Sequence, residues 1–342
     1  SLVPSFASGT VEYTYTVGPH VTAVTITGTA NATTSTVTGN GTYNPQEVSE
    51  VVLTVKAEDG TEKNYTVNLV RTKSTDNKLK ALSVEGYTMN PAFSANTTSY
   101  TLTVPSTVTS VNVIAEANDT LATVTGDGNK TLSIGSNTAT VKVKAESGAE
   151  KTYTITITRK NNDATLKSLS LSGVTLTPTF ASGTTSYTAT VPFATTSTTV
   201  SAETNDTKAI VTGTGSKTLA VGENTISLLV KAEDTNITKT YTVTVTRAAA
   251  STNNYLSDLK VDGATVTGFN KNTLEYTLTP VAATKSSIAI AATAEDTTAT
   301  ITGTGTKTLS TGNNSYNIVV KAQSGAERTY KINVKRLSND AL

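Results

Sequence analysis

The chain is built of short stretches in which hydrophobic and polar residues alternate. Clear examples are 226–232 (ISLLVKA) and 240–247 (TYTVTVTR), which are separated by a polar turn. Alternation with a period of two over four to eight residues predicts a strand with one buried face. No segment shows the 3.6-residue periodicity of an amphipathic helix. The pattern therefore predicts an all-β protein.

This pair of strands is written four times, at 52–71, 139–159, 227–247 and 317–336. Each copy contains a tyrosine and closes on an arginine, and both recur every 88 or 89 residues. These landmarks are Tyr65, Tyr153, Tyr241 and Tyr330, with Arg71, Arg159, Arg247 and Arg336. A fixed period of this length indicates a tandem array.

Each period contains about seven short strands and fits one two-sheet antiparallel sandwich. The sequence predicts four such domains, joined by linkers too short to act as flexible tethers, in an elongated rod. The expected ranges are 1–71 for repeat 1, 78–159 for repeat 2, 166–247 for repeat 3 and 255–336 for repeat 4, with 337–342 beginning a further linker.

Further landmarks hold the same order in the repeats: an opening L-x-x-L-x-V-x-G, a Pro-x-Phe, a strand SYTxTVP, a TGxG and the closing VKAEDG…YTVTVTR. Together they resemble the bacterial cadherin-like β-sandwich repeat, an Ig-like module. The resemblance covers nearly the whole chain. It departs at Thr267, where the Pro-x-Phe proline is absent, and in repeat 1, which has no opening strand. It implies an extracellular structural or adhesive module without shared catalytic residues.

The two ends are out of register with the domains. Repeats 2 to 4 begin with LKALSVEG, LKSLSLSG and LSDLKVDG, which repeat 1 lacks, and 337–342 matches the linker into repeat 3. One interpretation is a window onto a longer array. The other is strand complementation, in which a neighbouring chain supplies the opening strand of repeat 1.

Composition excludes several classes of function. Twenty-seven Lys and Arg against 26 Asp and Glu give a net charge of +1, without the basic footprint of a nucleic-acid binder. No apolar run reaches membrane-spanning length. Cysteine is absent, and His20 is the single histidine, so a repeated histidine-based triad is impossible. We expect no enzyme, no catalytic or cofactor-binding residue and no cofactor.

Acidic residues raise two further candidate sites. Carboxylates occupy the hairpin turns of repeats 1 and 3 but do not recur in repeats 2 and 4, which favours solvated turns over an acid–base pair: Glu58 and Asp59, Glu233 and Asp234, against Glu146 and Ser147, Gln323 and Ser324. Linker acids could hold calcium, but the third linker offers only asparagines before Asp258, so turn and capping roles are favoured and no metal site is predicted: Asp76, Asp163 and Asp340, against Asn253 and Asn254.

Other recurrent residues have structural interpretations. The tyrosines alternate with β-branched residues and are expected in the core, and tryptophan is absent, which disfavours a sugar-binding platform. The closing arginines are expected to pair with a carboxylate of the same or the next domain. Asn31, Asn118, Asn205 and Asn236 lie in sequons that matter only after eukaryotic secretion.

The sequence therefore predicts a non-catalytic extracellular stalk or fibre with a structural or adhesive role on a bacterial surface. Its expected partners are neighbouring sandwiches of the same or an identical chain, and a surface polymer or host ligand. One alternative is a filament subunit that polymerises by strand complementation into repeat 1. Another is a glycan-binding accessory array of a secreted hydrolase.

Overall fold

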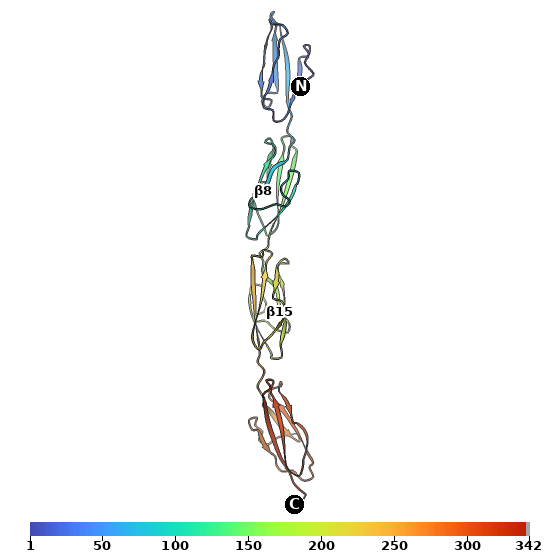
Figure 1. Ribbon diagram of the computed structural model, residues 1–342, viewed down its shortest axis with the longest axis vertical. Coiled ribbons are helices and arrows are strands. Elements are labelled where there is room, and N and C mark those ends of the chain that lie inside the picture. Colours follow the sequence, from blue (N-terminus) through green and yellow to red (C-terminus); the bar gives the residue numbers. More distant parts are fainter. Residues whose placement is uncertain (340–342) are drawn as a thin grey trace. The chain divides into compact units, whose positions relative to one another are not determined.

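The computed structural model describes residues 1–339, and over these residues it is all-β, with 29 strands and no helix (Figure 1). The chain divides into two compact units. One holds 1–163 together with 231–237, and the other holds 164–230 and the residues from 238 onward. The predicted fold class, four tandem β-sandwiches, is confirmed.

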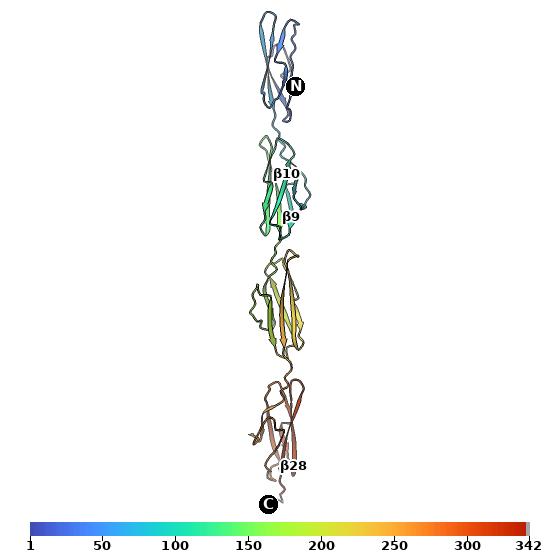
Figure 2. The same cartoon turned by 90° about the vertical axis from the view of Figure 1, so that its left-hand side faces the viewer.

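Repeat 2, in the first unit, shows the sandwich clearly. One sheet has the order β12-β10-β8 and the other β11-β13-β14-β9 (Figure 2). Its strands are β8 (Leu79–Val84), β9 (Ser99–Val104), β10 (Ser110–Ala117), β11 (Thr123–Thr125), β12 (Gly128–Thr131), β13 (Gly135–Lys144) and β14 (Glu150–Arg159).

The pairing is antiparallel with one exception. Strand β9 runs parallel to β14, with Tyr100 opposite Ile155. A parallel neighbour needs a long crossover, and here the chain between β9 and β14 builds most of both sheets before it returns. Local alternation does not reveal this pairing, because it sets which face of a strand is buried and not the direction of its neighbour.

The alternation in sequence becomes alternation in burial. In β14, Tyr153, Ile155 and Ile157 are fully buried, while the residues between them are partly exposed. They pack against the apolar face of β8, where Leu79, Leu82 and Val84 are buried. Because each buried aliphatic side chain contributes about 1.5–3 kcal/mol, this two-sided core supplies most of the favourable energy of the domain.

Repeats 3 and 4 repeat this design in the second unit. In repeat 3 the sheets are β15-β17-β19 and β16-β21-β20-β18, and in repeat 4 they are β23-β22-β25-β27 and β24-β29-β28-β26. The strands are β15 (Leu166–Leu171), β16 (Ser186–Val191), β17 (Ser197–Thr204), β18 (Ile210–Thr212), β19 (Gly215–Thr218), β20 (Gly222–Lys231), β21 (Thr238–Arg247), β22 (Leu256–Val261), β23 (Ala264–Thr265), β24 (Glu275–Thr277), β25 (Ser287–Ala294), β26 (Thr300–Thr302), β27 (Gly305–Thr308), β28 (Gly312–Lys321) and β29 (Glu327–Arg336).

Repeat 1 has one complete sheet, β1-β2-β7-β6-β4, but its second sheet within 1–339 is only the pair β3-β5. The strands are β1 (Leu2–Val3), β2 (Glu12–Val17), β3 (Val24–Ile26), β4 (Thr36–Thr38), β5 (Gly41–Tyr43), β6 (Glu50–Lys56) and β7 (Glu62–Arg71). The other repeats add an opening strand, β8, β15 or β22, beside the counterpart of β3. The second sheet of repeat 1 is therefore open along one edge.

Candidate functional site

The most connected polar groups lie where a linker meets the closing hairpin of the following repeat. At the first linker, the backbone N–H of Ser74 donates to Glu146 Oε2 at 3.0 Å. The backbone N–H of Ser147, in the same turn, donates to the carbonyl of Ser74 at 2.9 Å. This pair of hydrogen bonds, the linker clasp, fixes one linker residue from both sides.

The linker clasp recurs at the other two linkers. In the first unit, Asn161 donates to Glu233 Oε2 at 2.9 Å and accepts from the N–H of Asp234 at 3.0 Å. In the second unit, Ser251 donates to the side-chain Oε1 of Gln323 at 3.1 Å and accepts from the N–H of Ser324 at 2.9 Å.

The interpretation of these turns as solvated is therefore wrong for repeats 2 to 4. It compared charge along the repeats, and charge does not recur at this position. What recurs is a side-chain oxygen acceptor, which glutamate and glutamine both carry. Asp234 departs furthest from the expectation, because its Oδ2 accepts the backbone N–H and the Oγ–H of Ser106, at 2.8 and 2.7 Å. Both residues are only 3% exposed, and the bonds from Ser106 lower the pKa of Asp234.

Arg71 strengthens the first linker clasp. Its guanidinium makes an ion pair and hydrogen bonds with Glu146 and also donates to the carbonyl of Pro19 at 2.8 Å. These bonds from Arg71, followed by the bond from the Ser74 N–H, lower the pKa of Glu146 to about 2. The carboxylate therefore stays charged in any but strongly acidic solution.

The other closing arginines behave differently, so the expected carboxylate pair holds for Arg71 alone among them. Arg159 donates from Nε and Nη2 to the carbonyl of Ser106, at 2.9 and 2.6 Å, and from Nη1 to that of Leu132 at 2.9 Å. Arg247 and Arg336 bind two carbonyls of their own repeats in the same way. The planar fork of N–H donors joins two loops of one domain here, a task that needs no acidic partner.

The single histidine lies at the first linker clasp. His20 Nε2 is 3.3 Å from Asp119 Oδ2, and Asp119 also accepts the hydroxyl of Ser74, which lowers its pKa. The carboxylate thus stands between the serine and the histidine. In a nucleophilic triad the histidine must contact the hydroxyl and remove its proton. The arrangement here instead orders the linker.

The recurrent tyrosines are buried, as expected, and each joins the opening strand to the closing hairpin. The Tyr153 hydroxyl accepts the N–H of Leu79 at 3.1 Å and donates to the carbonyl of Ala95 at 2.8 Å. The same two bonds occur at Tyr241 and Tyr330. All three rings are fully buried and present no face to a sugar.

The linker acids make local contacts. Asp76 accepts the side-chain N–H of Asn118 at 2.7 Å and the backbone N–H of Lys78 at 2.9 Å. The backbone of Asp163 donates to Asn161 Oδ1, Asp258 pairs with Lys260, and Asp340 lies outside the described residues. Within 1–339, no three His, Cys, Asp or Glu side chains come together in a group that could hold a metal ion.

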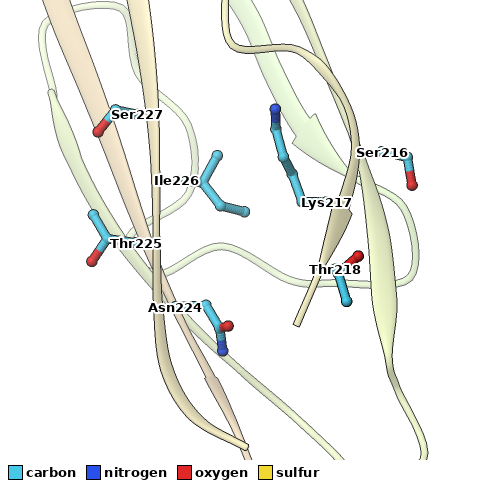
Figure 3. A pocket seen from close by; sticks show the side chains of 7 residues that line it. All are labelled: Ser216, Lys217, Thr218, Asn224, Thr225, Ile226 and Ser227. Carbon is cyan, nitrogen blue, oxygen red and sulfur yellow. The ribbon is translucent and has the colours of Figure 1, made fainter. Parts of the chain in front are cut away.

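One opening in repeat 3 lies between β19 and β20, where Lys217 and Ile226 face each other (Figure 3). It is open to solvent and lined largely by hydroxyls, without an aromatic ring. The amide of Asn224 is committed to the turn, since it accepts from the N–H of Ala220 and donates to the carbonyls of Ala220 and Gly222. Nothing in this opening suggests a built ligand site.

Comparisons with known proteins agree with this architecture. No curated protein matches the sequence. Among solved structures, the human desmocollin-1 ectodomain matches at 12% identity with a TM-score of 0.26, covering 96% of this chain and 80% of that one. Mouse cadherin-23 EC22-24 matches at 12% identity with a TM-score of 0.30, covering 74% and 99%. Drosophila N-cadherin EC1-4 matches at 9% identity with a TM-score of 0.22, covering 92% and 94%.

The family model described as a cadherin-like beta sandwich domain matches four times, at 1–72, 79–160, 166–248 and 256–337. Domains of this kind are extracellular modules, typical of adhesive or structural ectodomains, and are generally not enzymes. A search of residues 1–339 finds no helix long and apolar enough to cross a membrane. With all four repeats matched, the chain belongs to the family of cadherin-like beta sandwich domains.

Proposed function

We propose that this chain is a non-catalytic structural or adhesive array at a bacterial cell surface, in which each closing hairpin holds the linker that precedes it. The observation that carries the proposal is the recurrence of the linker clasp at Ser74, Asn161 and Ser251. Its bacterial setting is supported by the absence of cysteine, since secreted eukaryotic β-domains more often contain disulfides.

The linker clasp suits a mechanical role because it removes freedom where a tandem array would otherwise be loose. Each ordered backbone residue costs about 1–2 kcal/mol of conformational entropy, and a reciprocal pair of bonds on a single residue offsets part of this cost. Hydrogen bonds to a charged acceptor are stronger than neutral ones. Glu146 and Glu233 therefore restrain their linkers better than a water-solvated turn would.

The proposed partners are neighbouring sandwiches of the same or an identical chain, with a surface polymer or host ligand as the adhesive target. Specific glycan binding by an accessory array has no support from the tyrosines, because Tyr153, Tyr241 and Tyr330 are fully buried. A glycan array probed with the full chain separates these functions. Specific, saturable binding to one glycan class would replace the structural role by the accessory one.

A spin-label measurement tests the mechanical role directly. The chain has no cysteine, so Thr16→Cys and Thr103→Cys, both at exposed strand positions of the first unit, give a unique label pair across the first linker. Glu146→Ala is expected to broaden the distance distribution between the labels. An equally narrow distribution in the variant would remove the linker clasp as the basis of the function.

The matched control is Glu150→Ala in the same hairpin. Glu150 pairs with Lys142 of its own repeat at 3.0 Å and does not contact the linker. This substitution removes the same charge and the same ion-pair type from the same hairpin. It is expected to leave the distance distribution unchanged.

A further inference from the structure

The open edge of repeat 1 is marked first by strand length. Strand β3 has three residues, whereas its counterparts β10, β17 and β25 have eight each. Those eight-residue strands pair on one side with a short strand and on the other with an opening strand. The difference therefore lies in the missing neighbour, since the β5 side of β3 is paired in all four repeats.

The register of the missing neighbour follows from repeat 2. The motifs TVTGNG at 36–41 and TVTGDG at 123–128 align the two repeats and place Ile26 at the position of Val113. In repeat 2, Val113 lies opposite Val84 and Ala115 opposite Leu82. The vacant position in repeat 1 accordingly runs antiparallel beside residues 26–30.

Backbone groups at this edge point outward. In repeat 2 the carbonyl of Asn112 accepts from Glu85, so alternate residues, including Ile114, direct their N–H and C=O toward the opening strand. Thr27 holds the position of Ile114. Its neighbour Gly28 faces the other side, where its N–H and C=O bind the Asn40 side chain at 2.7 and 3.1 Å.

The tyrosine of the closing hairpin gives a second, independent mark. The Tyr65 hydroxyl donates to the carbonyl of Ser8 at 2.9 Å, but no N–H within 1–339 donates to it. Tyr153, Tyr241 and Tyr330 each accept such an N–H from the first leucine of an opening strand. Phe6, which stacks on this cluster, is 66% exposed, whereas its counterpart Phe93 is half-buried.

The hairpin turn of repeat 1 gives a third mark. Glu58 and Asp59 repeat the Glu–Asp sequence of Glu233 and Asp234, which bind the linker residue Asn161. Within 1–339 no linker residue donates to Glu58. Strand edge, tyrosine hydroxyl and turn thus present, on one domain, the contacts that 161–171 satisfies in repeat 3.

We propose that the edge of residues 26–30, with Tyr65 and the Glu58 turn, binds an extended polypeptide segment of the pattern Leu-x-x-Leu-x-(Val/Leu) preceded by a polar linker. The segment adds as an antiparallel strand, and its first leucine N–H donates to Tyr65. A folded second copy does not supply it, because β8, β15 and β22 are already paired and buried in their own domains. This inference is independent of the proposed mechanical role.

The test uses the full chain and a synthetic peptide with the sequence of residues 160–173, KNNDATLKSLSLSG. Fluorescence anisotropy of the labelled peptide is expected to show saturable binding of one peptide per chain. A peptide with Leu169→Asp carries a charge on the apolar face and should bind at least roughly tenfold more weakly. No saturable binding to the folded chain would overturn the proposal.

Two protein variants locate the bound peptide. Thr27→Pro removes the N–H that faces the open edge and should weaken binding at least roughly tenfold, while Thr27→Ala keeps that N–H and should bind normally. Tyr65→Phe removes the acceptor and should weaken binding roughly threefold to tenfold. Equal binding by all variants would overturn the proposal. So would self-association of the chain, in light scattering, that Thr27→Pro abolishes, because a second copy would then be the occupant.

Discussion

Glu146 in a hairpin turn accepts the backbone N–H of Ser74, a linker residue 72 positions earlier in the chain, at 3.0 Å. The hairpin that closes one sandwich therefore also orders the segment that introduces it. Because the same relationship holds for Glu233 with Asn161 and Gln323 with Ser251, it is a property of the repeat.

The first linker clasp should depend on pH through Glu146. Its pKa in the folded chain is about 2, below the ordinary value of 4.5, chiefly because of the bonds from Arg71. A lowered pKa means that the contribution of the ionised group is complete above pH 4.5 and is lost as pH falls through about 2. The Ser74 amide resonance should therefore shift with a midpoint near pH 2.

Glu146→Gln is the control for this titration, because its amide retains the oxygen acceptor without the charge. Its Ser74 resonance should no longer show that midpoint. A wild-type midpoint near pH 4.5 would mean that Glu146 titrates as a free carboxyl group and does not hold the linker.

Tyr153→Phe should loosen the attachment of the opening strand in repeat 2. The change leaves the buried N–H of Leu79 without its acceptor, which costs about 1–3 kcal/mol. Hydrogen exchange at the Leu79 amide should accelerate, and Tyr65→Phe, where no such N–H is bound within 1–339, should cost less. Equal destabilisation by the two substitutions would show that the N–H contact contributes nothing.

Leu166→Ala should destabilise repeat 3 by about 2–5 kcal/mol, because this side chain is fully buried between the two sheets. Differential scanning calorimetry of the full chain should show one transition moved to lower temperature. The neighbouring substitution Lys167→Ala, at an exposed surface pair with Glu203, should change stability by no more than about 0.5 kcal/mol. Similar effects of the two would contradict the assigned core.

Gly126→Ala should be far more damaging than Gly148→Ala. Both glycines have a positive φ, 85° and 93°, so alanine costs each about 1–2 kcal/mol of backbone strain. A Cβ at Gly126 would additionally lie 2.1 Å from the carbonyl oxygen of Thr140, whereas a Cβ at Gly148 meets nothing within 4 Å. Urea denaturation should separate the two variants clearly, and equal midpoints would rule out the close approach of β13 to Gly126.

Much of the fold was predictable because it is written in local patterns. Alternation gave the strands and their buried faces, and a fixed period gave the number of sandwiches. The buried tyrosines followed from the same alternation. The parallel pairing of β9 with β14 did not, since it depends on where a strand returns after a long crossover.

The linker clasp escaped prediction for two physical reasons. Its acceptor is a side-chain oxygen shared by Glu146 and Gln323, so a comparison of charge hides it. Its donor is a backbone N–H, which every residue except proline carries and which no sequence pattern marks. The carbonyl contacts of Arg159 were missed for the same reason. The recurring Glu or Gln after VKA was the one available signal.

Amide hydrogen exchange at the linker residues tests the linker clasp most directly. The amides of Ser74, Asn161 and Ser251 should be protected, and Glu146→Ala should abolish protection at Ser74 while leaving it at Asn161 and Ser251. Exchange at Ser74 in the wild-type chain as fast as at its neighbour Lys73 would contradict the claim that the closing hairpin holds the linker.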